Sequence, residues 1–247
     1  MKYFFPDSQD QIDPGFDFIN ERFSPNRIRQ LTDRYAHEIL RPIPYQGILV
    51  SKAAIAGDGR NRRYSFVHQR IFRREGVRKF YRLDEQPGER LEAMGDCGSF
   101  TYIKEEKPNV TVQELIDYYE KNGFDYGIAP DHIIPAYRLG WDENPQAVST
   151  QWVQRWKLTL KLAEQFIDAH NHQKCSFQPI GVAQGWGKES FGIAVQILQE
   201  LGYQRIAIGG MAYRNSDLML DLLQYINGKL KKEIEIHLLG ISRPELI

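Results

Sequence analysis

Residues 177–211 read FQPIGVAQGWGKESFGIAVQILQELGYQRIAIGGM, and their pattern predicts a strand, a helix and a second strand in succession. Apolar runs at 177–182 and 205–208 are typical of buried strands. The longer segment 188–201 has helical spacing and is followed by Gly202, a residue type that commonly ends a helix. A strand–helix–strand unit of this kind belongs to a parallel sheet covered by helices, so the stretch predicts an α/β fold.

The same alternation of strands and helices extends on both sides of this stretch, from residue 46 to residue 247. Further strands are expected at 47–50, 91–96, 124–128 and 234–239, and further helices at 111–122, 145–172 and 216–230. Thr111 and Glu114 have the spacing of a capping box at a helix start. Because a closed barrel needs eight strands and the pattern predicts six, we expect a TIM (β/α)8 barrel-like fold, truncated after about six strands.

Residues 1–45 differ from this pattern, since they are rich in Pro, Asp, Arg and aromatic residues. We expect them to form an N-terminal segment that lies over a domain and contains one helix, at 25–40. Residues 46–247 are expected to form the barrel domain. The two parts together predict one large domain with a leading segment.

The composition is that of an ordinary globular protein, and 42% apolar residues exclude a disordered chain. Lys and Arg together number 32, as do Asp and Glu, so a nucleic-acid partner has to be bound by a local patch. Two cysteines, Cys97 and Cys175, are too few for a disulfide framework and lack zinc-site spacing, which indicates a reducing compartment. A signal peptide and a membrane-spanning run are both missing, so we expect a cytoplasmic protein without membrane contact.

Polar residues and glycines follow four of the predicted strands, where parallel α/β proteins place their active sites. The candidates are Asp96, Asp131, Gln184 and the pair Gly209–Gly210. A carboxylate suits proton transfer or the N–H edge of a purine, an amide suits a carbonyl such as guanine O6, and glycines let a flat ligand approach the backbone. Each also has a plain alternative, because Asp caps turns and helices and Gln-Gly or Gly-Gly occurs in tight loops.

Two nearby features are not expected to be catalytic. The segment from Gly181 to Glu189 superficially resembles a phosphate-binding loop, but its glycines are one residue too far apart and Glu189 replaces the magnesium-binding Ser or Thr. Nucleotide hydrolysis is therefore rejected. His132 is expected to be a packed histidine.

A basic stretch from Arg60 to Arg82 is the one region with the composition of a nucleic-acid-binding surface. It holds nine Lys and Arg residues against one acid, Glu75, and aromatic residues lie among them. The aromatic residues are Tyr64, Phe66, Phe72, Phe80 and Tyr81. The candidate nucleic-acid-binding residues are Arg62, Arg63, Arg70, Arg73, Arg74, Arg78 and Lys79. The alternative is a solvated basic hairpin whose charge is balanced elsewhere.

Taken in order, six motifs resemble the tRNA-guanine transglycosylase family. They are Asp96-x-Gly-x-Phe100, Thr111-x-x-Glu-Leu-Ile-x-Tyr-Tyr119, Asp131 at a strand end, Gly181-x-x-Gln-Gly185, Ile208-Gly-Gly-Met211 and Leu238-Leu-Gly-Ile-Ser-Arg-Pro-Glu-Leu246. Within the family the chain is most similar to the branch that inserts deazapurines into DNA, the deoxypurine-in-DNA protein A group. The resemblance covers roughly residues 46–247.

This resemblance implies a pentosyltransferase that replaces guanine in a nucleic acid, DNA rather than tRNA, by a 7-deazaguanine such as preQ0. In that family an aspartate nucleophile attacks C1′ of the nucleoside and forms a covalent intermediate. The resemblance implies that Asp96 is the catalytic acid/base, that Asp131 recognises the base edge and that Gln184 reads its carbonyl. It also implies that Gly209, Gly210, Met211 and Phe100 bind the substrate base.

The chain departs from the family pattern in three respects. Cys97 and Ser99 stand where the family has Ser and Gly. The family's nucleophilic Asp and its zinc cluster follow the last of the six motifs, where this sequence ends. We therefore expect neither the nucleophile nor a metal or other cofactor in this chain. We also expect a homodimer or a complementing C-terminal polypeptide to cover the open edges of such a barrel.

Two alternatives to a DNA-directed transglycosylase remain open. One is a non-catalytic base- or nucleic-acid-binding subunit that partners an active transglycosylase, and the other is a tRNA-directed guanine transglycosylase.

Overall fold

The computed structural model describes residues 2–7, 11–28, 31–56, 64–84, 90–212 and 215–241. By its contacts the chain divides into two compact units. The first unit consists of Met1–Gly95 with Lys121–Asp125, and the second of Asp96–Glu120 with Tyr126–Ile247. The boundary predicted after residue 45 stays a prediction.

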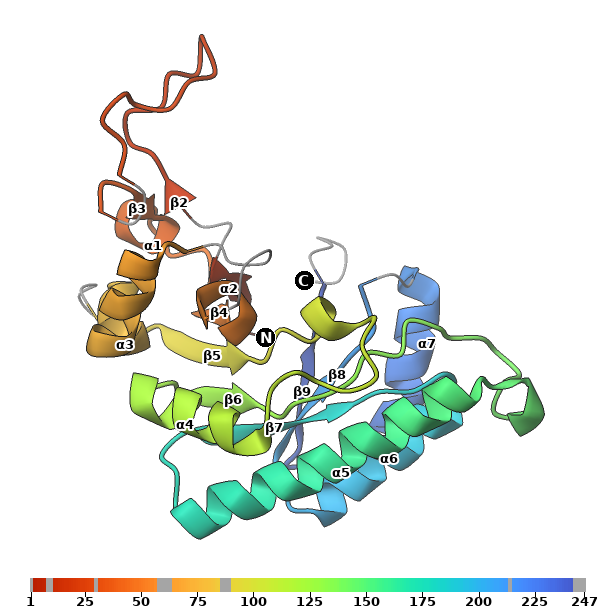
Figure 1. Ribbon diagram of the computed structural model, residues 1–247. Coiled ribbons are helices and arrows are strands. Elements are labelled where there is room, and N and C mark those ends of the chain that lie inside the picture. The colour runs from red at the N-terminus through yellow and green to blue at the C-terminus, as the bar shows by residue number, and fades with distance from the viewer. Residues whose placement is uncertain are drawn as a thin grey trace. The chain divides into compact units, whose positions relative to one another are not determined.

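The first unit contains short parallel strands with helices between them (Figure 1). Its elements are β1 (Phe4–Pro6), β2 (Gln11–Ile12), β3 (Arg34–Tyr35), α1 (Ala36–Ile39), β4 (Gly47–Ser51), α2 (Lys52–Ala56), α3 (Phe66–Phe80) and β5 (Glu92–Asp96). β1 pairs with β4 in parallel, with Phe4 opposite Gly47, whereas β2 and β3 form a separate antiparallel pair. Position 47 has to be glycine, because a Cβ there would overlap the carbonyl oxygen of Glu92 and the ring of Phe4.

The helix predicted at 25–40 is wrong, since among the described residues of that range, 25–28 and 31–40, only Ala36–Ile39 is helical. Side chains form a turn before it: Thr32 Oγ1 accepts a hydrogen bond from the Ile28 N–H, and Arg27 pairs with buried Asp33 at 2.7 Å. Such local bonds between side chains and backbone compete with helix formation.

The strand β1 was not predicted. With it, the larger sheet of the described residues has seven strands, against the six expected.

Helix α3 was also not predicted, and it carries most of the basic stretch. It begins at the N-cap Ser65 and contains a kink at Gly76, whose φ of 75° lies in the left-handed region that favours glycine. A Cβ at Gly76 would also press against the carbonyl oxygen of Asn122. The predicted alternative of a basic hairpin is therefore wrong for the described part of the stretch, because residues 66–80 are helical.

The second unit is a parallel sheet with helices against it. Its elements are η3 (Ser99–Tyr102), α4 (Val112–Asn122), β6 (Tyr126–Ile128), η4 (Pro145–Ala147), α5 (Thr150–Gln173), β7 (Gln178–Ala183), α6 (Lys188–Glu200), β8 (Arg205–Ile208), α7 (Ser216–Asn227) and β9 (Glu235–Leu238). The strands pair in chain order, β6 with β7, β7 with β8 and β8 with β9, all parallel. Helices α5 and α6 pack against β7 and against each other (Figure 1).

Strands in chain order, parallel and alternating with helices, are the arrangement found in (β/α) barrels, so the predicted α/β, barrel-like fold class is confirmed. The predicted helix signals are confirmed as well. The Thr111 N–H donates to Glu114 Oε2 at 2.8 Å, and the Glu114 N–H donates to Thr111 Oγ1 at 3.2 Å. Gly123 and Gly202 follow α4 and α6 with φ of 70° and 96°.

Within the described ranges, none of the helices combines the length and the apolar character that crossing a membrane requires.

Candidate functional site

Asp131 is the centre of a buried polar cluster in the second unit. It follows β6 through Ala129 and Pro130, and only 2% of its surface is exposed. Gln184, at the end of β7, donates from Nε2 to Asp131 Oδ2 at 2.6 Å. The thiol of Cys97 lies 3.7 Å from the other carboxylate oxygen, and Tyr102 donates its hydroxyl to the Asp131 carbonyl at 3.0 Å. The ends of two neighbouring strands thus bring a carboxylate and an amide into direct contact.

Burial raises the pKa of Asp131 to about 6, because the charged form loses its hydration. The hydrogen bond from Gln184 lowers the pKa and opposes this effect, whereas the charge of Asp96 raises it further. A carboxyl group with a pKa near neutrality can be held in either protonation state by a bound ligand. Such perturbed groups are common at functional sites.

Asp96 closes β5 and begins the turn to η3. Its Oδ2 accepts a hydrogen bond from the Gly98 N–H at 2.9 Å, and Gly98 has a left-handed φ of 86°. The alternative that Asp96 caps its own loop is therefore realised. The same carboxylate still acts electrostatically on Asp131, so the turn role and a place beside the cluster coexist.

Cys97 and Tyr102 were not predicted as site residues, yet both belong to the cluster. Cys97 Sγ lies 3.0 Å from the Tyr102 hydroxyl, and both side chains are buried. Burial raises the pKa of the Cys97 thiol well above its usual value, so the thiol stays protonated and can donate. The one sequence signal was that Cys97 replaces a serine of the family motif.

Gln184 has its amide fixed at both ends, because its Oε1 accepts from the Ile134 N–H at 3.3 Å while its Nε2 bonds to Asp131. Gly209 makes this possible, since a Cβ there would overlap the Gln184 amide.

Gly210 has a left-handed φ of 69°. The Met211 side chain is buried among the hydrophobic residues around α6 and α7, so only its backbone could face a ligand.

The structure therefore brings together Asp96, Asp131, Gln184 and Gly209, in agreement with their expected proximity at the strand ends. Phe100 is 51% exposed on η3. His132 is fully buried, as expected of a packed histidine, and burial lowers the pKa of its ring. Within the described ranges, no group of three His, Cys, Asp or Glu side chains is arranged to hold a metal ion.

The start of helix α6, where the sequence superficially resembled a phosphate-binding loop, is occupied by a carboxylate of the chain itself. Asp142 accepts hydrogen bonds from the N–H groups of Glu189 and Ser190 at 2.9 and 3.2 Å. Lys188 pairs with Asp221 at 2.6 Å. The backbone donors and the lysine that a phosphate would need are thus already bonded, which agrees with the rejection of nucleotide hydrolysis.

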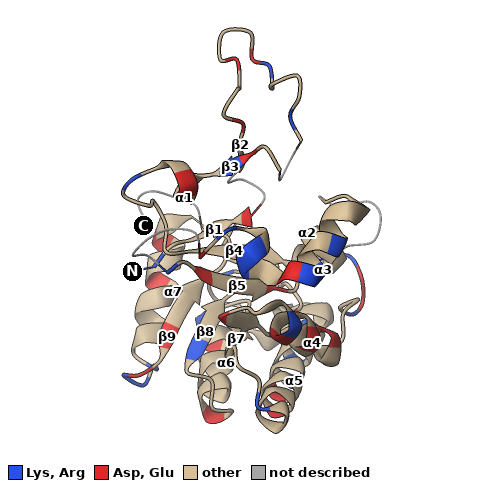
Figure 2. Cartoon of the chain, turned by 90° about the vertical axis from the view of Figure 1, so that its left-hand side faces the viewer, with Lys and Arg blue, Asp and Glu red and all other residues tan. Residues whose placement is uncertain are grey.

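The basic residues of the predicted nucleic-acid surface lie on α3 in the first unit, apart from Arg62 and Arg63, which lie outside the described residues (Figure 2). Arg70, Arg73, Arg74 and Lys79 are exposed. A surface hollow of about 510 Å³ is lined by Val67, Arg70, Ile71, Arg73 and Arg74. Basic and apolar side chains of α3 thus line the hollow together.

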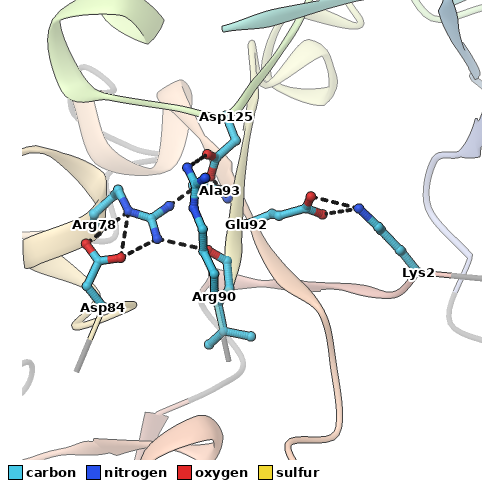
Figure 3. Close-up of polar contacts among 8 residues, drawn as sticks. Lys2, Arg78, Asp84, Arg90, Glu92, Ala93 and Asp125 are labelled. Atoms are coloured by element: carbon cyan, nitrogen blue, oxygen red, sulfur yellow. Dashed lines mark hydrogen bonds and ion pairs between the residues drawn. The ribbon is translucent and has the colours of Figure 1, made fainter. Parts of the chain in front are cut away.

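The assignment of Arg78 to this surface needs correction. Its guanidinium contacts both carboxylate oxygens of Asp84, lies 2.9 Å from Asp125 and bonds to the Leu91 carbonyl at 3.2 Å (Figure 3). Asp125 in turn accepts from the Ala93 N–H at 2.8 Å and pairs with Arg90 at 2.6 Å. Arg78 therefore stabilises the first unit and is not available for phosphate.

Most of the aromatic residues in this stretch are buried, so they do not belong to a nucleic-acid-binding surface. Tyr64, Phe72, Phe80 and Tyr81 are at most 7% exposed, because they form the buried face of the segment. The hydroxyls of Tyr64 and Tyr81 both donate to the buried carboxylate of Asp7. Phe66 differs, since it is 68% exposed at the start of α3.

A comparison with known proteins identified a relative of this chain. The chain is 41% identical over 246 residues to a DNA-guanine transglycosylase of Salmonella montevideo, and the match covers 99% of this chain. The same match covers 58% of the relative, so the chain spans a little more than half of that protein's length. No protein-family model matches the chain. An identity of 41% over nearly the whole chain is consistent with the resemblance to the tRNA-guanine transglycosylase family and its DNA-modifying branch.

Proposed function

We propose that this chain carries the base-binding part of a cytoplasmic transglycosylase that replaces guanine in DNA by a 7-deazaguanine of the preQ0 type. The single observation that carries the proposal is the buried Asp131 carboxylate, held by Gln184 and influenced by Asp96 at adjoining strand ends. The relationship to a DNA-guanine transglycosylase favours DNA over tRNA.

Guanine presents two N–H donors and one carbonyl acceptor along one edge. In the proposed complex the Asp131 carboxylate accepts from the N–H groups, and the Gln184 amide donates to the carbonyl O6. In the structure, Gln184 Nε2 bonds to Asp131 instead. Binding therefore exchanges one internal hydrogen bond for bonds to the base, which avoids leaving either buried group unpaired.

The proposed exchange runs in two steps that balance. In the first, the bond from C1′ to guanine N9 breaks, an ester bond forms between C1′ and an aspartate, and Asp96 gives a proton to the leaving base. In the second, the incoming base gives its N9 proton to Asp96, its N9 bonds to C1′ and the ester breaks. We assign the nucleophile to none of the residues described above.

The test is incorporation of labelled guanine by the full chain, alone and together with the remaining part of the Salmonella montevideo relative. We expect label to enter DNA and not tRNA. Label that enters tRNA alone would identify a tRNA-directed enzyme. Guanine binding without incorporation under either condition would favour the non-catalytic subunit, and a chain that binds no guanine would refute the base site.

We further propose that DNA contacts the exposed face of α3 through Arg70, Arg73 and Arg74. Of these, Arg74 also pairs with Glu75 at 2.7 Å, although 72% of its side chain remains exposed. Charge complementarity with phosphate supports this proposal, as does the hollow that the three arginines line.

Replacing Arg70 and Arg73 by Ala is expected to weaken DNA binding in a way that depends on salt. Each lost phosphate contact lowers the slope of log affinity against log salt concentration by roughly 1. Fluorescence anisotropy with a DNA duplex from low to moderate salt measures the slope. The matched control replaces Lys157 and Lys161, two exposed lysines of α5, by Ala. Equal slopes in both double variants would contradict a DNA contact on α3.

A further inference from the structure

Helix α5 presents a buried arginine to the backbone of two loops. Arg155 is only 5% exposed, and its Nη1 donates to the carbonyl of Ile133 at 2.8 Å. Its Nη2 donates to the carbonyl of Ile103 at 2.6 Å. Ile133 follows Asp131 by two residues, and Ile103 ends the turn that begins at Asp96 and passes through η3. One guanidinium therefore joins the two loops that carry the two carboxylates.

Two further hydrogen bonds hold the same loops. His132 Nε2 lies 3.0 Å from the Glu105 carbonyl, which joins the loops a second time. Thr159, one helical turn after Arg155 on α5, accepts from the His132 N–H through its Oγ1 at 3.0 Å. Arg155, His132 and Thr159 thus form a clasp, which anchors both loops to one buried face of α5.

Burying the Arg155 guanidinium costs free energy, because the charge loses its hydration. Among the residues that the structure describes, none of the ion pairs involves Arg155, and burial lowers its pKa. An apolar residue of similar length would fill the same volume without the cost of desolvating a charge. The planar guanidinium offers what an apolar residue cannot, namely two fixed donors that reach two carbonyls at once.

We propose that Arg155 is a positioning residue, which fixes the spacing between the Asp96 loop and the Asp131 loop so that both carboxylates can act on one base. This inference rests on the proposed function for its purpose, but its structural part concerns only the two loops. Arg155 touches neither carboxylate in the contacts described, so it acts through the backbone.

The test compares three variants of the full chain. Arg155→Met removes both hydrogen bonds at similar length, and Arg155→Lys keeps the charge but cannot hold two carbonyls in a planar fork. Lys157→Met, at an exposed position two residues along α5, is the matched control. Hydrogen exchange read by mass spectrometry reports on residues 97–105 and 130–136, and calorimetry with guanine reports on the base site.

We expect amide exchange in both loops to be about tenfold faster in the Arg155→Met chain than in the control, with peptides from β7 and β8 unchanged. Guanine affinity should fall roughly 10- to 100-fold in Arg155→Met and by less in Arg155→Lys, because slightly misplaced groups bind the base poorly. If Arg155 served stability alone, its replacement would instead speed amide hydrogen exchange throughout the second unit. That result would overturn the proposal.

Other outcomes also decide the matter. If amide exchange in the two loops is the same in both Arg155 variants as in the control, the clasp does not hold the loops and the proposal is refuted. If Arg155→Met does not fold, faster loop exchange and weaker guanine binding in Arg155→Lys still support the proposal, and their absence refutes it. If the wild-type chain binds no guanine but the loops loosen as expected, the clasp stands and the proposed function fails.

Discussion

Replacing Asp131 by Asn is expected to reduce guanine exchange by about 10³-fold, because a site built to pair with polar groups discriminates strongly when one partner is wrong. An Asn amide presents N–H groups where guanine presents its own, so donors would face donors. The labelled-guanine assay measures the loss. Asp168→Asn, at an exposed position on α5, is the matched control and should leave exchange unchanged.

The same substitution is expected to make the chain more stable at pH 8. The pKa of Asp131 is about 6 in the folded chain against an ordinary value of 3.8, so the folded chain holds a proton that the unfolded chain releases between these values. Stability therefore falls as pH rises through this window and stays lower above it. Asn carries no charge to bury, which gives the variant an advantage of about 3 kcal/mol at pH 8 and almost none below pH 4.

Thermal melts of both chains at the two pH values measure this effect. An advantage of that size corresponds to roughly 6–12 °C in Tm for a chain of this length. A variant that melts lower than the wild type at every pH would show that Asp131 serves the fold rather than a ligand. An Asp131→Asn chain that is more stable than the wild type but loses guanine exchange shows the pattern expected of a functional group that costs the fold stability.

The second large effect is expected at Arg78. Replacing it by Met should lower the free energy of unfolding by roughly 2–4 kcal/mol, since breaking a partly buried network leaves its partners uncompensated. Asp125 is the partner most affected, because only 18% of its side chain is exposed and it also accepts from the Ala93 N–H (Figure 3). Denaturant unfolding of the full chain measures the change.

Arg74→Met is the matched control for this prediction. The Arg74 side chain is 72% exposed and pairs with Glu75 on the surface, so its loss should change stability by no more than about 0.5 kcal/mol. DNA affinity should show the reverse order and fall in Arg74→Met but not in Arg78→Met. A stable Arg78→Met chain with weakened DNA binding would restore Arg78 to the nucleic-acid surface.

Local sequence patterns predicted the strands and helices that depend on short-range physics. Apolar runs identified β4 to β9, and Gly123 and Gly202 marked where α4 and α6 end, because side-chain period and left-handed φ are properties of a few adjacent residues. The β1 strand and the α3 helix escaped prediction. The first is three residues long, and the second is interrupted by the kink at Gly76.

The candidate site divides in the same way. The sequence by itself determined that Asp96, Asp131, Gln184 and Gly209 stand at strand ends, and parallel strands necessarily bring such ends to one edge. Only the tertiary structure decided that Gln184 bonds to Asp131, which lies 53 residues away, and that Cys97 joins them. No local spacing encodes a contact at that separation.

The basic stretch shows most clearly why the sequence alone does not determine the role of a charged residue. All its arginines look alike in the sequence, but Arg78 meets Asp125, 47 residues further on, and becomes part of the fold, while Arg70 and Arg73 stay exposed. Arg155, buried against the carbonyls of Ile103 and Ile133, gave no sequence signal at all. Residue type and period fix local structure, whereas the role of a charge depends on which distant groups the folded chain brings within reach of it.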